Sequence, residues 1–102
     1  MKKKVYSFKA KVEMFPGESP WYFVAVPEEI TSEKELLIKL KNIKGFRFLR
    51  INVKVGETTW DTSLLPLGKI SPGRKFIAIK KAIRKMEFIQ FKDEISVDFF
   101  VI

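Results

Sequence analysis

The sequence predicts a mainly β fold: a small six-stranded barrel built from two ββαβ halves, with two short helices. Apolar and polar residues alternate over Tyr6–Met14 and again over Ile95–Ile102, which is the period of strands with one buried face. A second observation is an internal repeat, in which F-V-A-V-P-E-E-I at 23–30 returns as F-I-A-I-K-K-A-I at 76–83. A repeated pattern of this kind indicates a duplicated architecture.

The chain has the length of a single domain, 102 residues, and we divide it into two halves at about 5–55 and 57–102. In the first half we expect strands over 6–14, 21–26 and 46–55 and a helix over 33–42. Pro27 ends the second strand because proline has no N–H to donate. Ser32 and Glu35 have the spacing of a capping box, which predicts the start of the helix. The apolar face of the strand over 46–55 switches part-way, as at a β-bulge.

The second half has the same order of elements as the first: strand, loop, strand, helix, turn, strand. We expect strands over 58–65, 76–79 and 95–102 and a short helix over 80–85. Gly56-Glu57 and Phe91–Glu94 are turns, and Pro66–Arg74 is a loop because it holds two Pro and two Gly. The agreement in order supports the repeat that the eight-residue pattern indicates.

Charge and composition limit the function. The formal net charge is +8, and the segment from Thr62 to Met86 has seven basic residues and no acidic one, which predicts an anionic partner. The absence of Cys and His excludes disulfides, thiolate zinc sites and catalysis by imidazole or thiol. We therefore expect no enzyme, no metal site and no cofactor.

The same composition bears on location and assembly. No run of the sequence approaches the ~20 apolar residues of a membrane helix, and residues 5–14 alternate with charges where a signal peptide needs an apolar run. We expect a cytoplasmic protein with no membrane partner. A barrel completed within one chain favours a monomer, while an open edge strand leaves a dimer as the alternative.

Two families share motifs with the chain. Residues 79–97 resemble the strand, helix, Gly-Asp turn and strand of AbrB-type swapped-hairpin barrels, and V-P-E-E-I at 26–30 is similar to their Val-Pro-x-x-Ile opening. A closer similarity covers nearly the whole chain: W-D-T-S-L-L-P at 60–66, followed by K-K-A-I-R-K at 80–85, is similar to the domain-of-unknown-function family 1905. That family is sometimes fused to YdeI or OmpD-associated bacteriocin-protection domains.

The resemblance implies a double-split β-barrel, a pseudo-dimer of the AbrB-like type, and it implies no reaction. Two positions depart from the family pattern. Lys92-Asp93 stands where Gly-Asp is usual, so this turn has to accommodate a side chain. Asp61 stands where a basic residue is common, which weakens a cationic role for its strand.

The first site hypothesis is a basic face over 69–85 that contacts nucleic acid or another anionic ligand. Besides Lys69, its residues are Arg74, Lys75, Lys80, Lys81, Arg84 and Lys85. Lysines that neutralise phosphates release counterions and give sequence-independent affinity, and arginine can hold a phosphate through two N–H groups. The alternative is a short exposed helix that carries lysine for solubility.

The second site hypothesis is a pocket for a small molecule, or an accessory role beside a fused domain. Its residues are Trp60, Thr62, Ser63 and Arg84, because an indole beside hydroxyls offers a stacking platform for a sugar or a base. On a strand, Trp60 and Thr62 share one face and Ser63 takes the other, so the alternative is a Trp60 that faces the core. We assign Trp21 to the packing of its own loop, with a place on the barrel rim as the alternative. No residue is assigned a catalytic role.

Overall fold

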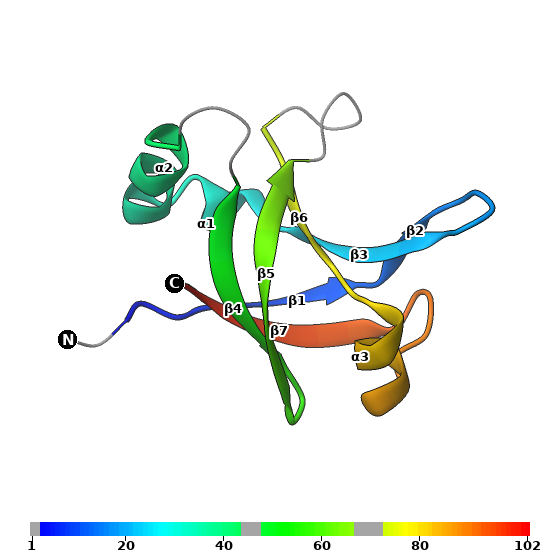
Figure 1. Ribbon diagram of the computed structural model, residues 1–102. Coiled ribbons are helices and arrows are strands. Elements are labelled where there is room, and N and C mark those ends of the chain that lie inside the picture. The colour runs from blue at the N-terminus through cyan, green and yellow to red at the C-terminus, as the bar shows by residue number, and fades with distance from the viewer. Residues whose placement is uncertain (1–2, 44–47, 67–72) are drawn as a thin grey trace.

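The computed structural model describes residues 3–43, 48–66 and 73–102. Its strands are β1 (Tyr6–Lys11), β2 (Glu13–Phe15), β3 (Trp21–Val26), β4 (Leu49–Val55), β5 (Thr58–Pro66), β6 (Lys75–Ala78) and β7 (Glu94–Val101), and its helices are α1 (Glu28–Thr31), α2 (Lys34–Lys41) and α3 (Lys81–Met86). The described strands form one antiparallel sheet in the order β1-β7-β4-β5-β6-β3-β2. The sheet curls into a half-barrel, with α2 and α3 at opposite ends (Figure 1). The prediction of a mainly β fold with short helices is confirmed.

The sheet has seven strands where six were expected, because the predicted first strand is divided at Val12. The Val12 N–H donates to the carbonyl of Asp93 at 2.8 Å, and the Val12 carbonyl accepts from the N–H of Lys92 at 2.9 Å. Up to Lys11 the chain pairs with β7, and from Glu13 it pairs with β3. The strand therefore changes partner at one buried residue, and a single period-two pattern becomes β1 and β2.

β4 begins at Leu49, whereas the predicted strand begins at residue 46. Ile51, Val53 and Val55 are buried on its inner face, whereas Phe48, just before the strand, is 48% exposed. The other positions involved in the predicted switch of apolar face, Phe46 and Arg47, lie outside the described residues. Within β4 itself the inward positions follow one unbroken alternation.

Three helices are present in the described residues, one more than expected. The additional helix, α1, follows Pro27 directly and has Glu28 and Glu29 in its first turn, where acids complement the helix dipole. The capping-box prediction at Ser32 is wrong. Glu33 caps α2 instead, since its carboxylate accepts from the N–H groups of Glu35 and Leu36, each at 3.1 Å.

Glu33 also ties α2 to the N-terminal segment. Its carboxylate accepts from the Tyr6 hydroxyl at 2.7 Å and from the Lys4 ammonium at 2.8 Å. These bonds lower the pKa of Glu33 to about 2, with the bond from Lys4 as the largest cause and that from Tyr6 as the second. Hydrogen bonds to a carboxylate stabilise its charged form, so this cap depends on ionisation.

The core lies inside the curl of the sheet. Its fully buried side chains are Phe99, Leu36, Ile51, Leu64, Ile77, Ile79, Val12, Val24, Val26, Val53 and Val97. Tyr6 stacks on Phe99 with ring centroids 5.1 Å apart. Phe15, Phe23 and Phe76 form a second aromatic group, in which Phe23 lies 4.5 Å from Phe15 and 5.3 Å from Phe76. The large rings provide much of the apolar area that a small domain buries.

The two copies of the repeat pair with each other. β3 and β6 are antiparallel neighbours in which Phe23 lies opposite Ala78, Val24 opposite Ile77 and Ala25 opposite Phe76. Val24 thus faces the residue that holds the same place in the second copy, and both are fully buried. Because the strands run in opposite directions, the chain that enters β3 lies beside the chain that leaves β6.

A candidate anion-binding groove

A groove of about 650 Å³ lies where the start of β3 meets the segment that connects β6 to α3. Its lining comes from two stretches, residues 19–22 and 78–81, together with Arg84. The Ile79 N–H donates to the Tyr22 carbonyl at 2.8 Å, which extends the β3–β6 ladder by one more bond. The groove is therefore built on sheet hydrogen bonds, which fix the separation of its two walls.

Arg84 is held in one position by two contacts. Its Nη1 donates to the Ile79 carbonyl at 2.6 Å, and its Cζ lies 3.8 Å from the centroid of the Tyr22 ring. A guanidinium over an aromatic face gains roughly 0.5–2 kcal/mol. Since arginine has five N–H donors and one serves Ile79, the planar fork is oriented in advance with donors to spare. The groove thus has a fixed cation at one wall.

The remaining polar and aromatic lining is open to solvent. Trp21 is 57% exposed, and both Lys80 and Lys81 are exposed at the start of α3. In the part of the chain that the structure describes, the one ion pair joins Lys4 to Glu33, so neither groove lysine has a partner carboxylate there. Two aromatic rings and three cations consequently share one concave surface.

The structure divides the predicted basic face. Lys80, Lys81 and Arg84 line the groove, whereas Arg74 and Lys75 lie at the other end of β6, beside the tip of β5 (Figure 1). Lys85 is exposed on α3 outside the groove lining. Lys69 falls outside the described residues. Half of the six predicted residues are therefore together in one site.

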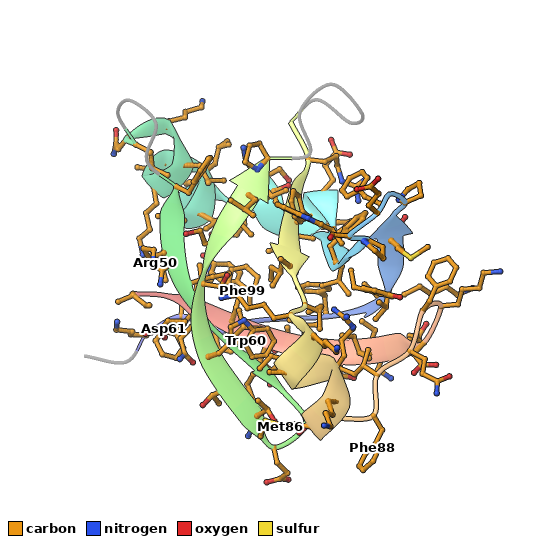
Figure 2. The ribbon with its side chains drawn as sticks, turned by 45° about the vertical axis from the view of Figure 1, so that its right-hand side comes forward. Arg50, Trp60, Asp61, Met86, Phe88 and Phe99 are labelled. Carbon is orange, nitrogen blue, oxygen red and sulfur yellow. The ribbon has the colours of Figure 1, made fainter. Side chains whose placement is uncertain are left out.

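The four residues of the predicted pocket are not brought together. Trp60 is half-buried against the core and Thr62 is buried beside it on the inner face of β5. Ser63 is on the outer face, where its Oγ accepts from Arg50 Nη1 at 3.0 Å. Figure 2 shows Trp60 on the side of β5 toward Phe99, with Asp61 and Arg50 on the opposite side. Arg84 belongs to the groove with Tyr22.

Trp60 retains one unusual feature. Its indole Nε1 is buried and has no hydrogen-bond partner among the described residues. On the outer face of the same strand, Asp61 accepts a hydrogen bond from Asn52 Nδ2 at 2.8 Å. This side of the sheet is therefore occupied by cross-strand pairs.

Sequence reasoning missed Trp21 and Tyr22 as members of the site. Trp21 was assigned no ligand role, and its exposed indole in the groove lining fits the alternative, a place on the barrel rim, better than it fits loop packing. The signal that could have found both residues is the repeat itself. If its copies pair antiparallel, the residues before Phe23 lie beside those after Ala78, which places Trp21 and Tyr22 next to the basic segment.

Two absences hold for residues 3–43, 48–66 and 73–102, which the structure describes. No group of three or more acidic, Cys or His residues there could hold a metal ion. No helix there is long and apolar enough to cross a membrane.

Fold and groove define a small domain of curled antiparallel sheet with a cationic, aromatic-lined groove. A family model, the domain of unknown function DUF1905, matches residues 8–99. The chain belongs to this family, as the sequence resemblance predicted, and every groove residue lies within the matched range. No curated protein matches the chain.

Proposed function

We propose that this domain is a non-enzymatic binding module whose groove holds a phosphate-bearing polyanion, with nucleic acid as the partner. The observation that carries the proposal is the fixed guanidinium of Arg84, held between Tyr22 and the Ile79 carbonyl beside two exposed lysines. A rigid fork of N–H donors matches the geometry of a phosphate, and lysines add point charges around it. The net charge of +8 attracts such a partner over longer distances.

Contacts of this kind bind without reading sequence. Readout of base edges in a duplex relies chiefly on Arg, Asn and Gln. The segment 62–86 has neither Asn nor Gln, and the groove arginine, Arg84, is already held by Tyr22 and the Ile79 carbonyl. Affinity would come mainly from counterion release, so it would fall as salt rises. The non-enzymatic part of the proposal is supported by the absence of His and Cys from the sequence.

The test compares two pairs of exposed lysines. Fluorescence anisotropy with a labelled oligonucleotide measures affinity for the wild type, for Lys80→Ala/Lys81→Ala, and for Lys39→Ala/Lys41→Ala. Both variants lose the same charge, and α2 carries the second pair at the far end of the sheet (Figure 1). We expect the groove pair to weaken binding about tenfold and to lower the slope of log K against log salt by about 1–2. Equal losses in the two variants would mean diffuse attraction and would reject the site.

A small molecule in the same groove is the second candidate. The volume of about 650 Å³ lies inside the range of about 300–1,000 Å³ for small-molecule sites. Compared with the predicted pocket, Arg84 remains and Trp21 takes the place of Trp60. In this alternative the domain is an accessory module, as the fusions to YdeI-type domains imply, and a partner domain supplies the chemistry.

We also propose that the curled sheet is a duplicated, double-split barrel of the AbrB-like pseudo-dimer type. Two features support it: Val24 lies opposite its counterpart Ile77, and β1 contacts β3 where the sheet curls back on itself. The likeness to AbrB-type barrels lends nucleic acid some weight as the partner, by fold analogy alone. An experimental structure in which residues 5–55 do not superpose on 57–102 would reject the duplication.

A further inference from the structure

Trp21 combines two properties that loop packing alone does not require. Its side chain is 57% exposed, although an indole is among the largest apolar groups. It is the first residue of β3 and lines the same groove as Lys80, Lys81 and Arg84. An exposed aromatic ring beside three cations is the arrangement that receives a flat, anionic ligand.

We propose that the groove binds single-stranded nucleic acid, with one base stacked on the indole of Trp21 and the adjoining phosphates on Lys80, Lys81 and Arg84. This inference rests on the proposed function and makes it more specific. In a duplex the faces of the bases are covered by their neighbours, and side chains reach only the edges and the backbone. A ring that is to stack on a base face therefore needs an unpaired strand.

The pair formed by Tyr22 and Arg84 provides a second flat surface. The Arg84 Cζ lies over the Tyr22 ring, 3.8 Å from its centroid, and Arg84 also lines the groove. Guanidinium planes stack on bases as aromatic rings do. The groove then has two stacking surfaces, Trp21 and the Arg84 plane, with lysines beside them for the backbone.

A strand fits these contacts better than a free nucleotide. One base stacked on one aromatic ring accounts for roughly a 5- to 150-fold gain in affinity, which by itself leaves a mononucleotide weakly bound. A strand reaches further cations, since Lys85 follows Lys81 by one turn on α3 and is exposed. Stacking also tolerates any base, in agreement with a groove that has no Asn or Gln in its lining.

The experiment measures the affinity of wild type and variants for three probes: a labelled dT oligonucleotide of about 12 nucleotides, a duplex with the same number of phosphates, and thymidine monophosphate as a competitor. The variants are Trp21→Leu and Trp21→Phe. The matched control is Phe88→Leu, because Phe88 is 87% exposed and follows α3 outside the groove lining. Figure 2 shows Phe88 extending into solvent below α3, near Met86.

We expect Trp21→Leu to weaken binding of the single strand about tenfold or more, with the duplex affinity unchanged. Trp21→Phe should stay within about threefold of wild type because it keeps an aromatic face, and Phe88→Leu should equal wild type. Equal binding of dT by wild type and Trp21→Leu overturns the inference, as does a preference for the duplex. Competition by the mononucleotide at the same concentration as the strand also overturns it, in favour of a small-molecule site. If Lys80→Ala/Lys81→Ala weakens the binding of single strand and duplex while Trp21→Leu changes the binding of neither, the proposed function stands without this inference. If neither variant changes the binding of either nucleic acid, both the proposed function and this inference are rejected.

Discussion

The turn between β4 and β5 is fixed by a contact with α3 that one methyl group would disrupt. Gly56 has φ 59 in this turn, and Glu87 ends α3 beside it. The Thr58 hydroxyl, in a residue only 8% exposed, donates to Glu87 Oε2 at 2.6 Å. A Cβ added at Gly56 would overlap the carboxylate of Glu87. The overlapping atoms are the end of a flexible side chain, so the carboxylate can rotate aside, and we expect this shift to break its bond with the Thr58 hydroxyl.

Two effects add in this variant. A left-handed backbone disfavours alanine by about 1–2 kcal/mol. Separating a buried hydroxyl from a charged acceptor costs about 1.5–3 kcal/mol. We therefore expect Gly56→Ala to lower the free energy of unfolding by about 3 kcal/mol, or the melting temperature by about 12–24 °C for a domain of this size.

A double-mutant cycle with Thr58→Val isolates the second effect. Urea denaturation followed by circular dichroism gives the free energy of unfolding of wild type, both single variants and the double variant. In the Thr58→Val background, Gly56→Ala should cost only the backbone effect, so the coupling energy should exceed about 1 kcal/mol. Gly73→Ala is the matched control, because Gly73 has φ 81 and no described atom lies within 4 Å of its added Cβ. Equal costs of Gly56→Ala in both backgrounds would refute the reasoning.

Two further predictions concern stability. Lys92 has φ 75, in the left-handed region that favours glycine, so Lys92→Gly should be more stable than Lys92→Ala by about 1 kcal/mol in urea denaturation; equal stability would show that the turn carries no such strain. The pKa of Glu33 is lowered to about 2 by its bonds from Lys4 and Tyr6, so its contribution to stability is full above its ordinary pKa of 4.5 and is lost as pH falls toward 2. Over that window the urea midpoint of the wild type should fall more steeply than that of Glu33→Gln, and parallel profiles would contradict the assignment.

Elements with one buried face could be predicted from the sequence. In β7 the alternation places Val97 and Phe99 inward, and both are buried. The break at Val12 could not be predicted, because it depends on backbone bonds to Lys92 and Asp93, which are distant in sequence. A local pattern contains no information about which partner a strand pairs with at each residue.

The cap of α2 and the position of Trp21 in the groove also depend on contacts between residues that are distant in sequence. Ser32 and Glu33 both precede the helix and both are able to accept a bond from its first N–H groups. Glu33 is the cap in the structure, where Tyr6 and Lys4 also donate to its carboxylate. In the groove, the cations could be predicted from charge, but the position of Trp21 depends on the pairing of β3 with β6.

The proposed duplication provides an internal comparison for the groove. Under a two-fold relation between Val24 and Ile77, the counterparts of Trp21 and Tyr22 are Arg74 and Lys75, which lie where Lys75 pairs with Val26. The counterparts of Lys81 and Arg84 are Glu28 and Thr31 in α1. An anion at that second place would meet Arg74 and Lys75, but it would also meet the Glu28 carboxylate and would find no aromatic ring among these four counterparts. Solubility alone would require only scattered charge on both halves. Cations occur at both equivalent places, and the groove adds Trp21 and Tyr22 to them with no carboxylate in the part of its lining that the structure describes. A ligand explains this difference better than solvation of a short helix does.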